Sequence, residues 1–125
     1  MANTFKLVTK AGVTTEDVIY TVAASTTTVV LGVMLGNTTT SQVTATVTLS
    51  SDTAARAGNN DEANQDVELI TNAPIPAGSS LELLAGNKIN METTDVLKLT
   101  ASGATDIALS IMEITLTLPK QMNSF

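Results

Sequence analysis

Residues 43–49 of the chain read Val-Thr-Ala-Thr-Val-Thr-Leu, with an apolar side chain at every second position and threonine between. Successive side chains of a β-strand point to opposite faces, so this alternation predicts a half-buried strand with one threonine face. Residues 97–101, Leu-Lys-Leu-Thr-Ala, repeat the pattern. Residues 29–36 carry apolar or glycine residues on both faces. That stretch predicts a strand that is covered on both sides or that lies at a subunit contact.

Turn sequences such as Lys10-Ala11-Gly12 and Pro76-Ala77-Gly78 separate the alternating stretches. The pattern predicts about eight strands, drawn from the stretches 5–9, 17–23, 27–36, 42–50, 66–73, 79–84, 87–91, 95–101 and 106–118. Many short strands without amphipathic helices between them favour an all-β fold, an antiparallel β-sandwich. Eight strands suit a jelly roll. With 125 residues, we expect one domain spanning residues 1–125.

Three local features refine this expectation. In the last strand the apolar positions are odd through Ile111 and even from Ile114, which predicts a β-bulge or bend near Met112-Glu113. Pro74 and Pro76 cannot donate to a strand ladder, so their stretch is an edge or a connector. Residues 51–65 are polar and rich in small side chains. We interpret them as an inserted loop with a functional or mobile character.

The composition argues against most chemistry. The chain has no histidine and no cysteine, which removes the commonest general base, the cysteine nucleophile and thiolate metal sites. It carries a net charge of −6, with six scattered basic residues and three aromatic ones. Nucleic-acid binding needs clustered cations, and an anionic membrane surface repels a negative chain. We therefore predict no enzymatic activity, no cofactor, no metal site, and no contact with nucleic acid or membrane.

Two pairs of carboxylates are the remaining catalytic candidates. Asp106 and Glu113 lie in the last predicted strand, and Glu92 and Asp95 flank a turn. A glycosidase also uses aromatic platforms for sugar rings, which are scarce here, so solvated turn formers are the favoured interpretation. The acidic stretch 59–66 lacks the spacing of an EF-hand loop and reads as polar surface. Tyr20 alternates with valines, so its ring is expected to face the core with its hydroxyl at the rim.

The ends of the chain are the candidate assembly contacts. The first residues lack the pattern of a signal peptide, and the apolar run 29–35 is too short to span a bilayer, so we expect synthesis in a cytoplasm. The terminal segments 1–6 and 119–125 are possible docking segments, and the loop 51–65 is the other candidate. The alternative is frayed termini and a mobile loop. The residues singled out as assembly contacts are Phe5, Arg56, Asp61, Met122 and Phe125.

Five stretches, in the same order, resemble a family of small virion proteins of tailed phages, seen especially in phages of cyanobacteria and other aquatic bacteria. Residues 18–32, Val-Ile-Tyr-Thr-Val-Ala-Ala-Ser-Thr-Thr-Thr-Val-Val-Leu-Gly, resemble the family's opening. The other four resemble its Thr/Val strand, its Pro-Ala-Gly turn and its two last strands: 43–49, 72–81, 94–101 and 107–114. The chain departs from the family at Ala23, where many relatives have proline, and at Thr94, where they have glycine. Residues 51–65 look like an insertion and 115–125 like an extension.

The resemblance implies a structural component of a virion, made in the host cytoplasm. The favoured interpretation is a capsid decoration or cement protein that bridges neighbouring major capsid subunits. Such a protein would be a symmetric homo-oligomer, with a trimer preferred to a dimer. The alternative is a neck, collar or tail accessory protein or a fibre adaptor, whose partners would be neck or tail proteins. A cellular carbohydrate-binding or adhesion module is the third hypothesis, from a different class.

Overall fold

The computed structural model describes residues 2–51, 65–84 and 86–115, and all of its regular structure there is β-strand. This confirms the predicted all-β class. The nine strands are β1 (Ala2–Val13), β2 (Asp17–Thr21), β3 (Thr26–Asn37), β4 (Val43–Ser51), β5 (Gln65–Ile75), β6 (Ser80–Glu82), β7 (Ile89–Met91), β8 (Val96–Ala101) and β9 (Thr105–Thr115).

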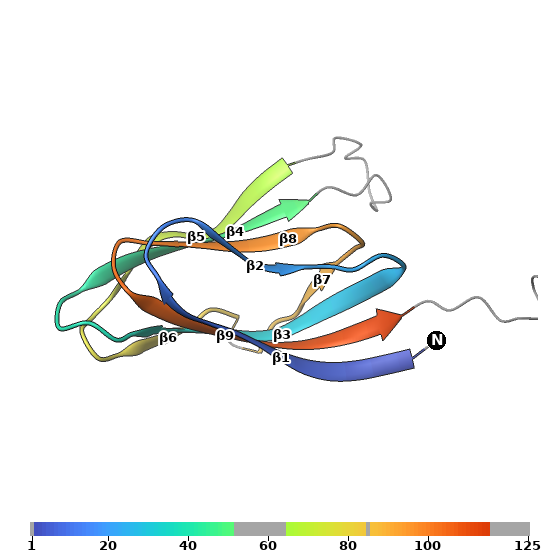
Figure 1. The fold of residues 1–125 in the computed structure, drawn as a ribbon, viewed down its shortest axis with the longest axis horizontal. Helices are drawn as coiled ribbons and strands as arrows, with labels where there is room; N and C mark the ends of the chain where they lie inside the picture. Colours follow the sequence, from blue (N-terminus) through green and yellow to red (C-terminus); the bar gives the residue numbers. More distant parts are fainter. Residues whose placement is uncertain (1, 52–64, 85, 116–125) are drawn as a thin grey trace, which may run out of the picture.

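The strands form two antiparallel sheets packed face to face (Figure 1). One sheet has the order β1-β9-β3-β6, with β7 also paired to β3, and the other has the order β2-β8-β4-β5. The chain changes sheet after β1, β2, β3, β5, β7 and β8, so most sequence neighbours lie in opposite layers. This strand order is that of a jelly roll, as the sequence predicted.

The core lies between the two layers and consists of aliphatic side chains from both. In β4 the apolar positions Val43, Ala45 and Val47 are buried and the threonines between them are mostly half-exposed. In β9 the odd positions Ile107, Leu109 and Ile111 are buried in the same way. The alternation of the sequence therefore marks the inner faces of both strands correctly.

The predicted bulge in β9 is wrong. The pairing of β9 with β1 runs without a shift from Ile107 to Thr115, and the irregularity lies in β3, between Val30 and Gly32. There the buried positions change from even, ending at Val30, to odd, beginning at Val33. The apolar phase of β9 changes for a different reason. The inner position 113 is occupied by a polar residue, Glu113, whereas the outer positions 112 and 114 carry the apolar residues Met112 and Ile114.

Pro74 lies in β5, which is an edge strand, so the prediction of an edge there is confirmed.

Asn37, buried at the end of β3, donates from Nδ2 to the carbonyl oxygens of Ser41 at 2.8 Å and Ile75 at 2.9 Å. Its Oδ1 accepts from the backbone N–H of Thr39 at 2.8 Å. The amide is thus satisfied, and it ties the end of β3 to the opposite sheet.

Candidate functional site

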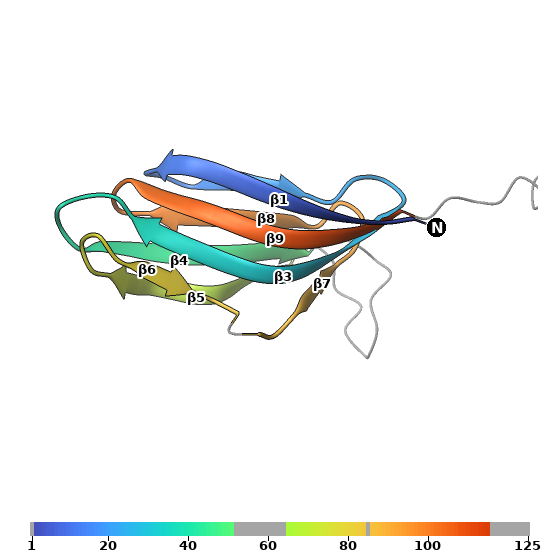
Figure 2. The ribbon, with the colours of Figure 1, turned by 90° about the horizontal axis from the view of Figure 1, so that it is seen from below.

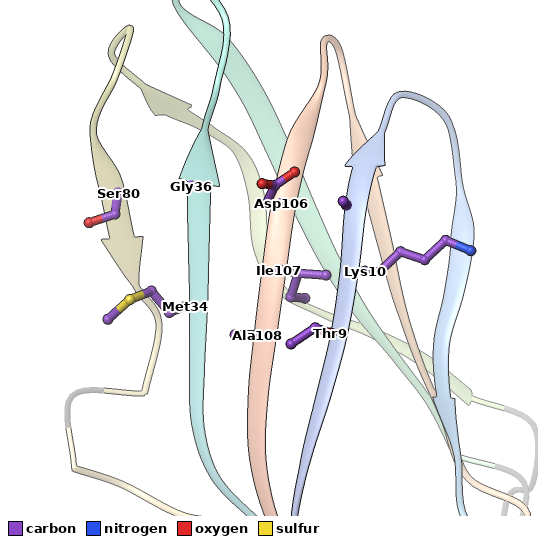
Figure 3. Close-up of a pocket in the computed structure, with 9 residues that line it drawn as sticks. Thr9, Lys10, Met34, Gly36, Ser80, Asp106, Ile107 and Ala108 are labelled. Atoms are coloured by element: carbon purple, nitrogen blue, oxygen red, sulfur yellow. The ribbon is translucent and has the colours of Figure 1, made fainter.

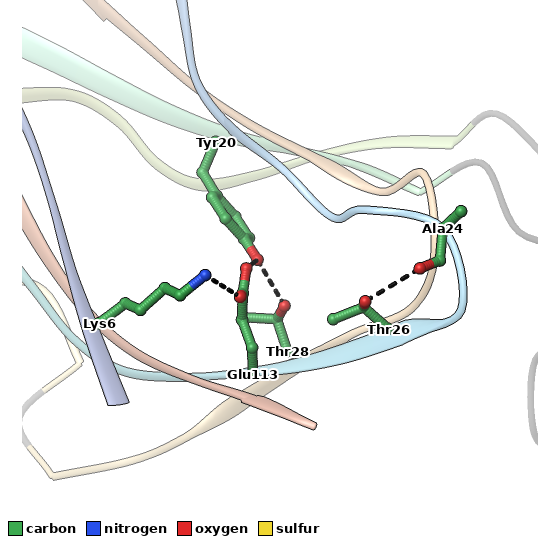
Figure 4. A network of polar contacts seen from close by, with 6 residues as sticks. All are labelled: Lys6, Tyr20, Ala24, Thr26, Thr28 and Glu113. Atoms are coloured by element: carbon green, nitrogen blue, oxygen red, sulfur yellow. Dashed lines mark hydrogen bonds and ion pairs between the residues drawn. The ribbon is translucent and has the colours of Figure 1, made fainter. Parts of the chain in front are cut away.

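Four polar side chains meet between the two sheets and join β1, β2, β3 and β9 (Figure 4). The hydroxyl of Tyr20 donates to Oε2 of Glu113 at 2.5 Å and lies 2.6 Å from Oγ1 of Thr28. Lys6 Nζ lies 2.7 Å from Oε1 of the same carboxylate. Thr28 and Glu113 are directly paired across β3 and β9, so the register places both beneath the tyrosine. The expected position of Tyr20, with its ring inward and its hydroxyl at the rim, is confirmed.

The electrostatics of this network favour a charged carboxylate and a neutral phenol. The hydrogen bond from Lys6, followed by that from Tyr20, holds the pKa of Glu113 below its usual range. Burial, followed by the hydrogen bond to Glu113, raises the pKa of Tyr20 to about 12. Every member of the network has a partner within the fold, and the network links the two layers. We therefore interpret it as a structural element.

The other carboxylates that were catalytic candidates from the sequence also accept hydrogen bonds from other residues of the chain. Asp106 Oδ1 accepts from the backbone N–H of Gly12 at 2.8 Å, and Asp95 Oδ2 accepts from that of Glu92 at 2.9 Å. Oε1 of Glu92 accepts a hydrogen bond from Thr27 at 3.4 Å. Within residues 2–51, 65–84 and 86–115, no group of three acidic, histidine or cysteine side chains could hold a metal ion. The same residues include no helix long and apolar enough to cross a membrane.

The most distinctive surface is the side of the β1-β9-β3 sheet that points away from the sandwich (Figure 2). The register sets its rows: Phe5 pairs with Met112, Leu7 with Ser110 and Thr9 with Ala108. Directly paired residues share a face, and the buried residues of β9 occupy the odd positions, so these rows all point outward. We define the outer face by the residues Phe5, Leu7, Thr9, Val29, Gly32, Met34, Gly36, Ala108, Ser110, Met112 and Ile114.

This outer face exposes large apolar side chains. Phe5 is 73% exposed, Leu7 is 69% exposed and Met34 is 47% exposed. The three come from both flanking strands, β1 and β3, and no described element of the chain lies over them (Figures 1 and 2). Several large exposed apolar side chains on one face of a sheet are typical of an interaction site.

The outer face is also hollowed, because small residues alternate with large ones. One hollow of about 380 Å³ is lined by Thr9, Met34, Gly36 and Ala108 and by the charged residues Lys10 and Asp106, among others (Figure 3). A second hollow, of about 400 Å³, lies on the other side of Met34 and is lined by Gly32 and Ser110 among others. A β-carbon built on either glycine would meet nothing within 4 Å, so the glycines leave these depressions open. We call the first of them the Thr9 hollow.

Two of the sequence-based expectations concern this surface: Phe5 as an assembly contact, and the stretch 29–36 as a strand covered on both sides or at a subunit contact. Phe5 lies in the first half of β1, in the row of Met112. Arg56, Asp61, Met122 and Phe125 lie outside the described residues. Leu7, Met112 and Ile114 were not expected at the surface. The signal for the last two is the change to even apolar positions in β9, which predicted a bulge but reflects an apolar outer face.

Comparison with known proteins bears on the fold. The chain matches no protein-family model, and no curated protein matches it. Among solved structures, it is similar to a chain of infectious bursal disease virus, Gx strain, with a TM-score of 0.50 and 11% identity over 90% of this chain. The match covers 32% of that viral chain, so this chain spans about a third of it.

Two further likenesses have lower scores. A chain in the T13 particle of the same virus has a TM-score of 0.45 and 9% identity, over 89% of this chain and 35% of the viral chain. A Bacillus endospore appendage, described as a disulfide-linked pilus, has a TM-score of 0.46 and 16% identity, over 93% of this chain and 88% of that one. Likeness at this level of identity concerns the fold alone, and the fold it concerns is an all-β sandwich.

Proposed function

We propose that this protein is a non-enzymatic structural subunit of a virus particle. Within that class we propose a capsid decoration or cement protein, which bridges neighbouring major capsid subunits as a symmetric oligomer. The observation that carries the proposal is the outer face. It is a broad apolar surface with exposed Phe5 and Leu7, built on strands rather than on loops. Such a surface is suited to permanent contact with another protein.

The physical basis of cementing is the burial of apolar area that spans two subunits. Separating the two subunits then also breaks the contact with the cement, so the cost of opening the shell rises. A jelly roll suits this task because two packed sheets hold an interaction surface rigidly. The network of Tyr20, Glu113, Thr28 and Lys6 ties the inner side of the outer-face strands to the opposite sheet. That linkage keeps the surface in one shape.

Two independent likenesses support the proposal. The five ordered stretches resemble small virion proteins of tailed phages, which motivates the decoration role. The sandwich resembles a chain in the structure of infectious bursal disease virus, which is a virus particle. Jelly rolls are common in viral capsid domains, although they also occur in lectins and cupins. The fold therefore favours the particle hypothesis only together with the outer face.

The test is the number of copies of this protein per particle, measured by quantitative mass spectrometry against the major capsid protein. A decoration protein is expected at a ratio near one, or at a simple fraction of one. A ratio of a few per cent would move the protein to the neck or tail, as an accessory protein or fibre adaptor. Absence from purified particles would contradict the particle role and return attention to a cellular carbohydrate-binding or adhesion module.

A variant series connects that measurement to the outer face. Leu7→Glu places a charge at the middle of the surface, and Val67→Glu makes the same exchange on β5 of the other sheet, where the valine is 50% exposed. We expect Leu7→Glu to lose incorporation and Val67→Glu to keep it. Equal incorporation of the two variants would show that incorporation does not depend on the outer face.

A further inference from the structure

The outer face combines projections and depressions on one surface. Phe5 and Leu7 project from β1, with 73% and 69% of their surface exposed. The Thr9 hollow lies further along the same strands, at the row in which Thr9 pairs with Ala108. A surface that carries both a knob and a matching hollow can pair with a copy of itself, since a twofold axis makes each residue contact its equivalent partner in both directions.

The strand register fixes the position of such a twofold axis. The row of Leu7 and Ser110 is midway between the row of Phe5 and Met112 and the row of Thr9 and Ala108. A twofold axis that runs across the strands at the middle row exchanges the two outer rows. Phe5 of one copy then lies over the Thr9 hollow of the other, and the reverse holds as well. Leu7 of one copy faces Leu7 of the other.

From this geometry we propose that the outer face binds the outer face of a second copy of this chain, with Phe5 of each copy seated in the Thr9 hollow of the other. The inference rests on the proposed function and deepens it, because it assigns the outer face to the contact between two copies within the proposed oligomer. The contact with the capsid then lies on another surface of that oligomer. The test of the inference in dilute solution is independent of particle incorporation, so the two can fail separately.

The size of the surface fits a reversible dimer. Three strands, β1, β9 and β3, about 4.8 Å apart and about twelve residues long, give a footprint of roughly 600 Å² per copy. Two copies then bury roughly 1,200 Å², at the lower end of the range for stable specific interfaces. We therefore expect a dissociation constant in the micromolar range, about 1–100 μM.

The net charge of the chain indicates that the dimer is held by apolar contacts and not by ion pairs. The side chains that project furthest from the face, Phe5 and Leu7, are apolar. The charged residues Glu82 and Asp106 lie in the rows of Met34 and Gly36, and each chain carries a net charge of −6. Two copies therefore repel one another weakly at long range, and salt screens that repulsion. We expect the dimer to become tighter when the ionic strength is raised from about 0.05 M to about 0.5 M. An association held by ion pairs would respond in the opposite direction.

The chain can be tested as it is, by sedimentation equilibrium across the micromolar range. We expect a monomer–dimer equilibrium for the natural sequence. Phe5→Glu removes the knob and should weaken dimerisation by about 30-fold or more, as loss of a central aromatic anchor does. Gly36→Leu fills the hollow, where a β-carbon meets nothing within 4 Å, and should weaken it similarly. Val67→Glu is the matched control and should leave the dimer intact.

Crosslinking tests the position of the axis. The chain has no cysteine, so Leu7→Cys introduces a single thiol at the middle row, and Val67→Cys introduces one on the other sheet. Under mild oxidation we expect a disulfide-linked dimer from Leu7→Cys and little from Val67→Cys. The proposal is overturned by a natural chain that stays monomeric at 100 μM (about the weakest affinity expected for this area). A trimer, or a dimer that tolerates both Phe5→Glu and Gly36→Leu, would overturn it equally.

Discussion

Gly103 lies between β8 and β9, against the buried side chain of Val43. A β-carbon at this position would lie 2.7 Å from Cγ1 of Val43, which is closer than van der Waals contact. We predict that Gly103→Ala destabilises the protein by about 1–3 kcal/mol, because a close-packed site has to shift to accept the methyl group. Urea unfolding measures the change in the free energy of unfolding.

The matched control for Gly103→Ala is Gly32→Ala. A β-carbon on Gly32 meets nothing within 4 Å, and the residue lies in a strand, where glycine costs backbone entropy. We expect Gly32→Ala to be neutral or to stabilise by about 0.5 kcal/mol. Equal effects of the two substitutions would mean that contact with Val43 does not explain the glycine at position 103.

Thr94 is a β-branched residue with a φ of 72°, in the left-handed region that such residues avoid. The backbone N–H of Asp95 donates to the carbonyl oxygen of Glu92 at 3.0 Å, so Thr94 is the third residue of a four-residue turn. A type II turn favours glycine at that position. We predict that Thr94→Gly raises the free energy of unfolding by about 0.5–1 kcal/mol, despite the entropy cost of glycine.

Thr93→Gly is the control for Thr94→Gly. The hydroxyl of Thr93 donates to the carbonyl oxygen of Thr26 at 3.0 Å, so its removal should destabilise the protein by about 1 kcal/mol. Opposite signs for the two neighbouring substitutions are the expected outcome, read from thermal and urea unfolding. If Thr94→Gly also lowers the free energy of unfolding, the stabilisation that the Thr94 side chain provides is larger than the backbone strain at this residue.

At the scale of elements, the hydrogen bond from Tyr20 to Glu113 joins β2 to β9 across the core. We predict that Tyr20→Phe lowers the free energy of unfolding by about 1–2 kcal/mol at neutral pH, because it removes one donor from a part-buried carboxylate. The pKa of Tyr20 is raised from 10.0 to about 12 in the folded chain, which means that folding favours the neutral phenol. Its contribution is therefore complete below pH 10 and is lost as the pH rises through about 12.

A spectroscopic titration checks this prediction directly, since Tyr20 is the only tyrosine. The absorbance of tyrosinate should appear near pH 12 in the folded protein and near pH 10 in urea. The stability difference between the natural chain and Tyr20→Phe should shrink over the same interval. A midpoint near pH 10 in the folded protein would contradict the hydrogen-bonded arrangement.

At the scale of the whole molecule, most strand pairs join segments far apart in the sequence. β1 and β9, near the two ends of the described chain, are direct neighbours, and β2 pairs with β8. Closing such large loops lowers the entropy of the chain before the contacts between the paired strands can compensate for that loss. We predict that refolding takes milliseconds to seconds, with the fluorescence of Tyr20 as the readout in stopped-flow experiments. Complete refolding in microseconds would be inconsistent with this topology.

Much of the fold could be predicted, but only part of the candidate site. Alternating valine and threonine located β4, and Pro74 located an edge strand. The residues that lie at the surface for assembly were harder to find. Met112 and Ile114 have the same apolar chemistry as core residues, and nothing local distinguishes an apolar side chain that faces the core from one that faces a partner.

The sequence by itself determined the all-β class, the approximate positions of most strands and the expected position of Tyr20. Those properties follow from a two-residue period and from turn residues, which are local. Only the tertiary structure decided that β1 lies beside β9, that the bulge is in β3, and that Phe5, Leu7 and Met34 share one open face. The physical reason is that strand pairing and register depend on contacts between distant segments, so the side of a sheet that stays uncovered is defined only when both layers are in place.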